Sequence, residues 1–230
     1  MTEARKPRTK RKPAAEAGAR DDAALKVAVL DAALPHVPFD GFTDKVLADA
    51  ATEAGLDKIS LVRLFPEGPL SLVEAFSESI DAEMEKRLAR LKLAQMKIRD
   101  RIGTAVTARL ALLKPHKEAA RRAAAFLTLP PHAPMGAKLL YRTVDTIWRA
   151  IGDTSTDFNF YTKRAILAAV YSATLMRWFT DDSEGEAATQ EFLAHRIDNV
   201  MQFEKLKADI RERTKTWPSF ADILRGGKRV

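Results

Sequence analysis

The sequence predicts an all-α fold of about ten helices, and three observations support that prediction. From Leu25 onward, apolar residues recur three and four positions apart, the spacing that places them on one face of an α-helix. No segment alternates apolar and polar residues convincingly, as half-buried strands do. Prolines and glycines fall between the periodic segments, as at Pro35, Gly55 and Pro66, where a helix ends.

The periodic segments and their breaks set the expected helix boundaries. The ranges, in chain order, are about 22–34, 43–54, 57–65, 70–90, 91–113, 116–127, 135–151, 157–179, 186–212 and 217–224. Thr43 is the expected N-cap of the second helix, because its hydroxyl accepts a hydrogen bond from the first turn. The segment 91–113 is expected to break near Gly103 or Pro115.

These helices group into four regions. Residues 1–20 are basic, with no bulky apolar residue after Met1, which predicts a disordered tail. Residues 21–68 form a helix-turn-helix-like region, and residues 69–212 form a larger helical domain. Residues 213–230 hold a short amphipathic helix and a basic tail.

Composition excludes several classes of protein. The chain of 230 residues has no cysteine, which removes disulfides and thiolate chemistry and fits a reducing compartment. No apolar run reaches the ~18 residues of a membrane span, and no signal peptide is visible. The net charge of +7 is concentrated in residues 1–20, 82–122 and 205–230. This charge favours nucleic acid or a membrane surface as partner, although a solvated helix face explains residues 82–122 equally well.

The first three predicted helices resemble the DNA-binding domain of TetR-family regulators. The likeness rests on the aromatic Phe42 after a short loop, the "A-x-x-A-G" pattern at 51–55, and the "L-x-x-x-F-P" ending at Leu61, Phe65 and Pro66. The resemblance implies a TetR-like helical fold. It also leaves a ligand-responsive transcriptional regulator as an alternative function.

The charge of this region argues against nucleic acid as a partner. Residues 40–64 carry three basic and five acidic side chains, a net of −2, whereas DNA binding depends on neutralising phosphates. The expected recognition helix carries Ile59, Ser60 and Val62 where TetR-type readers usually carry glycine, threonine and tyrosine. We therefore interpret the region as a degenerate helix-turn-helix that keeps its packing and lacks the contact surface.

No pattern of residues indicates an enzyme. No two histidines lie at the spacing of a metal site, and no cysteine is present to complete a zinc site. The charged residues near His195 fit a solvated helix face better than a metal site. Neither an E-x-x-H motif, a G-x-S-x-G motif nor a phosphate-binding glycine-rich loop occurs. We expect no catalytic residue, no metal and no cofactor.

The segment "GDTSTDFNFYTKR", residues 152–164, is the most distinctive string in the chain. Thr154 and Asp157 read as the start of a helix. On a helical projection Asp157, Phe160, Tyr161 and Arg164 share one sector, which we interpret as an outward docking surface. The alternative is a helix buried on all sides, which would require partners for the buried charges.

The C-terminal segment "WPSFADILRGGKRV" has the composition of an interfacial membrane helix. Its apolar face is followed by three basic residues, an arrangement that suits the surface of an anionic membrane. The expected membrane contacts are Trp217, Phe220, Ile223 and Leu224. A helix docked on the protein's own core, or on a second copy of the chain, is the alternative.

Residues 152–183 and the following "FLAHRIDNV" helix closely resemble the ninth coenzyme-Q biosynthesis protein family, over about residues 25–224. The resemblance implies a non-catalytic, dimeric lipid-binding accessory protein of ubiquinone synthesis. It would present quinone precursors at a membrane to demethoxyubiquinone hydroxylase. Residues 69–212 would then be the ligand-binding and dimerisation domain, and residues 213–230 the membrane-binding end.

The resemblance also implies a set of site residues. The surface for the hydroxylase would comprise Asp145, Ile147, Trp148, Asp157, Phe160, Tyr161 and Arg164. Phe160 stands where family members often carry tryptophan, so the indole N–H donor is missing here. Candidate lipid-binding residues are Leu127, Leu139, Leu140, Val144, Ile166, Val170 and Phe192, each of which also suits an ordinary core.

The implied ligand is an isoprenoid lipid, a ubiquinone precursor or a phospholipid. The expected assembly is a homodimer without nucleic acid. The expected location is a bacterial cytoplasm at the inner membrane, or the matrix side in a mitochondrion. A scaffold without a lipid pocket remains a third interpretation.

Overall fold

The computed structural model describes residues 13–156 and 158–215, and the side chains of residues 21–156 and 160–202. Every regular element within these ranges is helical, which confirms the predicted all-α fold. None of the described helices is long and apolar enough to cross a membrane. The predicted membrane helix at 217–224 lies outside the described residues.

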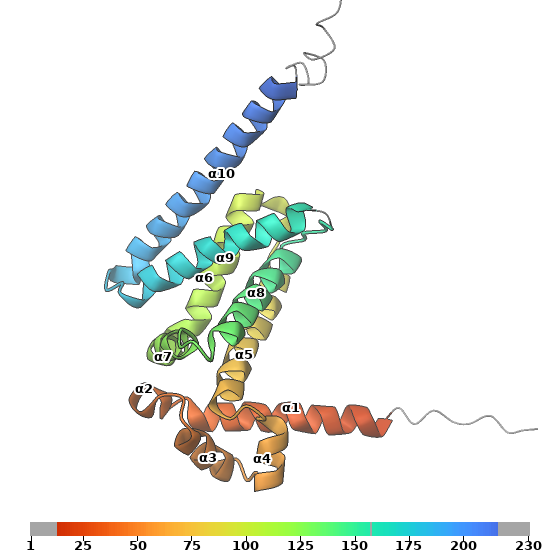
Figure 1. Cartoon of the computed structure of the whole chain (residues 1–230), viewed down its shortest axis with the longest axis vertical. Coiled ribbons are helices and arrows are strands. Elements are labelled where there is room, and N and C mark those ends of the chain that lie inside the picture. The colour runs from red at the N-terminus through yellow and green to blue at the C-terminus, as the bar shows by residue number, and fades with distance from the viewer. Residues whose placement is uncertain (1–12, 157, 216–230) are drawn as a thin grey trace, which may run out of the picture.

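Four helices form the N-terminal unit of the described chain. They are α1 (Pro13–Ala33), α2 (Val37–Asp40), α3 (Asp44–Glu53) and α4 (Lys58–Leu64). The Thr43 hydroxyl accepts a hydrogen bond from the Val46 N–H at 3.3 Å, which confirms Thr43 as the N-cap of α3. The Asp57 carboxylate caps α4 in the same way, from the Ser60 N–H at 2.7 Å. α1 lies across this end of the molecule and packs on α3 and α5 (Figure 1).

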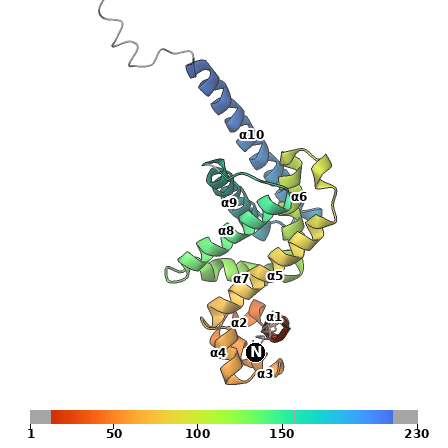
Figure 2. The ribbon, with the colours of Figure 1, turned by 90° about the vertical axis from the view of Figure 1, so that its right-hand side faces the viewer.

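Six further α-helices build the rest of the described chain. They are α5 (Pro69–Ala89), α6 (Ile98–Leu113), α7 (Lys117–Leu127), α8 (Ala133–Ala150), α9 (Phe158–Phe179) and α10 (Ala187–Lys215). Single turns of 3₁₀ helix, η1 (Leu93–Gln95), η2 (Lys114–His116) and η3 (Glu184–Glu186), lie before α6, α7 and α10. α8 packs against both α5 and α9, and α10 packs against α9 and α6. In both views α10 extends beyond the other helices (Figures 1 and 2).

A cluster of rings joins the N-terminal unit to the larger helical body. Phe42, from the connection before α3, is 5% exposed. Its ring centroid lies 6.3 Å from that of Phe76 on α5 and 6.4 Å from that of Phe126 on α7. Such tilted pairs bury large apolar surfaces. The two parts of the chain therefore share one continuous core.

The predicted starts of two helices were wrong, and one short helix was missed. α1 begins at Pro13 rather than near residue 22, because the alanine-rich stretch before Asp21 favours helix without bulky apolar residues. α6 starts at Ile98, continues through Gly103 and ends at Leu113 before Pro115. α2 was not predicted, because its single turn is too short to show a period.

Candidate functional site

The connection between α8 and α9 is folded tightly against the body. Gly152 adopts a positive φ of 90°, which glycine tolerates because it has no Cβ. The Asp153 N–H donates to the Trp148 carbonyl at 2.9 Å, closing the end of α8. Arg101 on α6 donates from Nη1 to the Ile151 carbonyl at 3.0 Å. The distinctive segment therefore starts from a fixed position.

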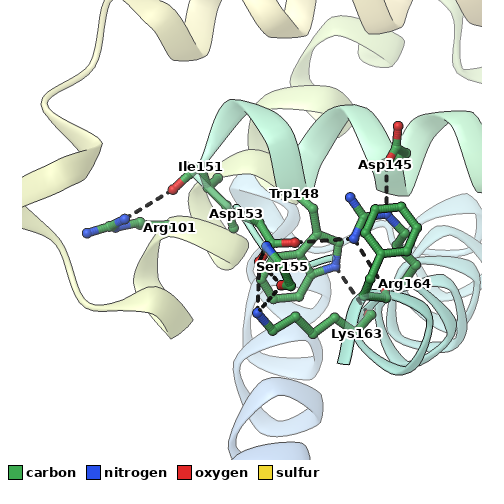
Figure 3. A network of polar contacts seen from close by, with 9 residues as sticks. Arg101, Asp145, Trp148, Ile151, Asp153, Ser155, Lys163 and Arg164 are labelled. Carbon is green, nitrogen blue, oxygen red and sulfur yellow. Dashed lines mark hydrogen bonds and ion pairs between the residues drawn. The ribbon is translucent and has the colours of Figure 1, made fainter. Parts of the chain in front are cut away.

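Asp153 is the centre of a polar network that binds this connection to α9 (Figure 3). Its Oδ1 accepts hydrogen bonds from Lys163 Nζ at 2.8 Å and from the Ser155 hydroxyl at 2.5 Å. Its Oδ2 accepts one from Arg164 Nη1 at 3.2 Å. Burial alone would raise the pKa of Asp153, but the hydrogen bonds from Lys163, Ser155 and Arg164 lower it to about 2. The carboxylate thus stays charged at neutral pH.

Arg164 connects the same network to α8. Its Nε donates to Asp145 Oδ1 at 2.7 Å, and only 3% of Arg164 and 8% of Asp145 are exposed. The guanidinium carbon also lies 3.4 Å from the centroid of the Phe160 ring, one turn earlier on α9. On the other side of Asp145, Arg149 Nη2 binds Oδ2 at 2.8 Å. Two carboxylates therefore hold Arg164 in place, and Arg164 in turn supports Phe160.

Trp148 lies beside this network rather than on the surface. Its indole Nε1 donates to the Lys163 carbonyl at 3.2 Å, and the Lys163 ammonium lies 5.4 Å from its ring centroid. The side chain is 6% exposed. Trp148 thus packs the start of α9 against α8.

Tyr161 is the exposed part of the predicted docking surface. It is 68% exposed, and its ring meets the half-buried Phe160 edge-on with centroids 5.1 Å apart. The prediction of an outward sector was wrong for Arg164, which is buried. Asp145, Ile147 and Trp148, which the resemblance implied at the hydroxylase surface, are buried as well. A helical projection gives the angle between residues but not which side another helix covers. Asp157 lies outside the described residues, as do Trp217, Phe220, Ile223 and Leu224.

A cavity of about 320 Å³ lies among α5, α6, α7, α8 and α9. Most of its walls are apolar, with Val73, Leu113 and Leu175 among the lining residues. Ala133 and Ala137 on α8 also line it and are exposed, so the cavity opens to solvent near the start of that helix. The volume is at the lower end of the range of small-molecule sites, and the cavity therefore suits part of a long lipid chain.

Three of the seven predicted lipid-binding residues line this cavity: Leu127, Leu139 and Leu140. Val144 and Val170 belong instead to the closed core, and are 1% and 7% exposed. Ile166 is half-buried and does not line the cavity. Phe192 lies on α10, with the Arg196 guanidinium 4.8 Å from its ring centroid. These four residues do not line this cavity, because apolar character alone does not separate a core position from a cavity wall.

Several polar residues of both sites were missed from the sequence. Asp153 and Lys163 hold the α8–α9 connection, and Arg109 lies at the cavity wall. Arg109 carried a signal, because it interrupts the apolar face formed by Val106, Leu110 and Leu113. No group of three or more potential metal ligands occurs among the described residues.

Two aliphatic side chains are exposed on α4, the second helix of the helix-turn-helix. On α4, Ile59 is 82% exposed and Val62 is 69% exposed. The basic residue of its last turn, Arg63, forms an ion pair with Asp22 on α1. The helix that would enter the DNA groove in a TetR-type reader thus presents apolar side chains.

Comparison with known proteins finds relatives that are named for ubiquinone biosynthesis. Residues 133–204 match the family model described as COQ9. The chain is 32% identical over 210 residues to the mitochondrial ubiquinone biosynthesis protein COQ9 of Drosophila melanogaster, covering 87% of this chain and 64% of that protein. The Bos taurus and Homo sapiens proteins of the same name are 35% and 34% identical over 77% of this chain. The chain spans 57% and 58% of their lengths.

A solved structure of a TetR transcriptional regulator from Nitrosomonas europaea has the same fold. The TM-score is 0.59 at 18% identity, over 76% of this chain and 97% of that one. This likeness confirms the TetR-like fold and carries no function with it. The matched residues 133–204 cover α8, the α8–α9 connection and α9, which contain the Asp153–Arg164 network. Residues 133–204 thus form a COQ9 domain, and most of the chain is similar in sequence to ubiquinone biosynthesis proteins of that name.

Proposed function

We propose that the protein is a non-catalytic lipid-binding accessory protein of ubiquinone biosynthesis. It holds an isoprenoid quinone precursor in the cavity between α5 and α9 and presents it to demethoxyubiquinone hydroxylase at a membrane surface. The observation that carries this proposal is the apolar cavity of about 320 Å³ that opens beside exposed alanines of α8. The assignment to ubiquinone biosynthesis rests on the names of the relatives.

The docking part of the proposal rests on Tyr161 and Phe160. Tyr161 is an exposed aromatic side chain on a helix whose first turns are fixed by the buried pair Arg164–Asp145. Rigid, exposed aromatic residues are common centres of protein interfaces. We assign the hydroxylase contact to this aromatic pair, with the charged residues behind it acting as supports.

Lipid extraction tests the cavity directly. Ala137→Trp places an indole at the cavity mouth on an exposed position of α8, and Ala82→Trp places one on an exposed position of α5 that does not line the cavity. Native mass spectrometry of the purified proteins should show co-purifying isoprenoid lipid with the unaltered chain and with Ala82→Trp. The lipid should be lost with Ala137→Trp. Equal lipid content in all three would contradict the assignment of this cavity.

A further inference from the structure

The cavity has mostly apolar walls but also contains a buried cluster of polar residues. Four of its lining residues take part: Ser77 on α5, Arg109 on α6, Thr143 on α8 and Tyr171 on α9. Each of them makes a hydrogen bond to another member or to Asp81 on α5. Arg109, Thr143, Tyr171 and Asp81 are each less than a tenth exposed. We call this set the Arg109 cluster.

Arg109 is the hub of the cluster. Its Nε donates to Asp81 Oδ1 at 2.7 Å, and its Nη2 donates to the Ser77 hydroxyl at 3.2 Å. Its Nη1 donates to the Tyr171 hydroxyl, and the guanidinium carbon lies 5.2 Å from the Tyr171 ring centroid. Thr143 completes the cluster by donating to Asp81 Oδ2 at 2.9 Å. Helices α5, α6, α8 and α9 therefore meet at one polar point.

The charges of the cluster cancel. Among the described residues that line the cavity, Arg109 is the only charged one, and its charge is compensated by Asp81. A buried phosphate or carboxylate needs a cation that is not already neutralised. The cluster therefore favours an uncharged ligand group over an anionic one.

The cluster retains hydrogen-bond donors. A guanidinium has five N–H groups, and the contacts of Arg109 to Asp81, Tyr171 and Ser77 use three of them. The Tyr171 hydroxyl accepts from Arg109, and no acceptor for its own hydrogen is found among the described residues. Burial raises the pKa of Tyr171, which keeps the O–H in place. A matching ligand group must therefore offer oxygen acceptors.

The cluster lies away from the opening of the cavity. Ala133 and Ala137, at the mouth, precede Thr143, in the cluster, by ten and six residues on α8. A rise of about 1.5 Å per residue separates their levels from that of Thr143 by about 15 Å and about 9 Å. On α9 the exposed lining residue Met176 follows Tyr171 by more than one turn. A ligand that reaches the cluster must therefore extend along the apolar walls.

We propose that the Arg109 cluster recognises the head of the bound lipid and selects an uncharged oxygen-bearing group, such as a quinone carbonyl, a phenol or a ring ether. This inference rests on the proposed lipid-binding function and adds to it the orientation of the lipid in the cavity. The head lies at Arg109 and Tyr171, and the chain runs toward the opening beside Ala133. Prenyl phosphates and plain hydrocarbons fit less well, because the first carries an uncompensated charge and the second leaves the donors unpaired.

The test compares three probes: a short-tailed ubiquinone, farnesene and farnesyl phosphate. The unaltered protein should bind the quinone most tightly. Tyr171→Phe and Ser77→Ala should each weaken quinone binding about three- to tenfold, the value of one hydrogen bond, and leave farnesene binding within about twofold. Leu175→Ala, which shortens an apolar wall, is the matched control and should weaken quinone and farnesene equally.

The outcomes separate this inference from the proposed function. The head-group assignment alone would be overturned if Tyr171→Phe and Ser77→Ala weakened quinone and farnesene binding equally. It would also be overturned if farnesyl phosphate bound most tightly. If the unaltered protein bound neither the quinone nor farnesene, both the head-group assignment and the proposed lipid-binding function would be overturned. Thermal unfolding of each variant checks that it is folded. Ser77 is half-buried, so Ser77→Ala still tests the head-group assignment if Tyr171→Phe does not fold.

Discussion

Arg164 of α9 and Asp145 of α8 form a buried ion pair, with Nε and Oδ1 2.7 Å apart. The Arg164 guanidinium also binds Asp153 Oδ2 at 3.2 Å and covers the Phe160 ring. One side chain thus links the end of α8, the connection after it and the start of α9. The position of the aromatic residues on α9 depends on this link.

Arg164→Gln should destabilise the protein strongly. The substitution leaves Asp145 and Asp153 buried with less compensation, and breaking one partner of a buried pair costs about 3–5 kcal/mol. Chemical denaturation measures the free energy of unfolding. Lys45→Gln, which removes an exposed ion pair to Asp49, is the control and should change stability by less than about 1 kcal/mol. Similar effects of the two substitutions would show that Arg164 is not a support of the fold.

Tyr161→Ala should weaken binding to demethoxyubiquinone hydroxylase without unfolding the protein. Tyr161 is 68% exposed, so its loss removes little packing from the core. An exposed aromatic centre of an interface is worth about 2 kcal/mol or more in binding. Titration calorimetry with the purified hydroxylase measures the effect.

Tyr141→Ala is the matched control for that experiment. Tyr141 is 46% exposed and lies on α8 one turn before Asp145, and among the described residues it makes no hydrogen bond to the Asp153–Arg164 network. We expect it to leave hydroxylase affinity unchanged. If both substitutions reduced hydroxylase affinity equally, the docking surface would not be centred on Tyr161. If Tyr161→Ala strongly reduced the stability of the protein, Tyr161 would be a core residue.

Stability should fall in acid as Asp153 is protonated. Its pKa is lowered from the ordinary value of 3.8 to about 2 in the folded protein. A carboxyl with a depressed folded pKa contributes stability above its unfolded pKa and loses it as the pH falls from about 4 toward about 2. Asp153→Asn should flatten the pH dependence of unfolding in this window. An unchanged acid profile in the variant would contradict the role of Asp153.

The helix-turn-helix should not bind DNA with sequence specificity. The exposed face of α4 carries Ile59 and Val62, and residues 40–64 have a net charge of −2. Fluorescence anisotropy with duplexes from the region upstream of the gene, at moderate salt, should show only weak binding that disappears as salt rises. Specific binding at nanomolar protein concentration would restore the alternative of a transcriptional regulator.

Removal of residues 217–230 should abolish flotation with anionic liposomes and leave the fold unchanged. The prediction rests on the aromatic and aliphatic residues of this segment and the basic residues that follow them. Circular dichroism and thermal unfolding serve as the folding control. If flotation persists after truncation, the segment has a packing role and the membrane contact lies elsewhere.

The sequence predicted most helices because their signals are local. Thr43 and Asp57 cap the helices that their positions suggested, and Gly152 ends α8 as a residue with positive φ. The segment 152–164 stands out in the sequence because it places aromatic rings and charges within the first turns of a helix. The missed single turn of α2 and the early start of α1 reflect signals that are short or lack bulky apolar residues.

By itself, the sequence determined the all-α class, the degenerate helix-turn-helix and the family likeness, since these depend on periodicity, charge and motif. Only the tertiary structure decided which side chains are buried. Arg164 and Tyr161 are three residues apart in the same helix, yet α8 and Asp145 cover the first and solvent surrounds the second. Arg109, Asp81 and Tyr171 meet at the cavity although they are distant in the chain. Burial and such long-range contacts depend on how helices pack against one another, and a one-dimensional pattern does not contain that information.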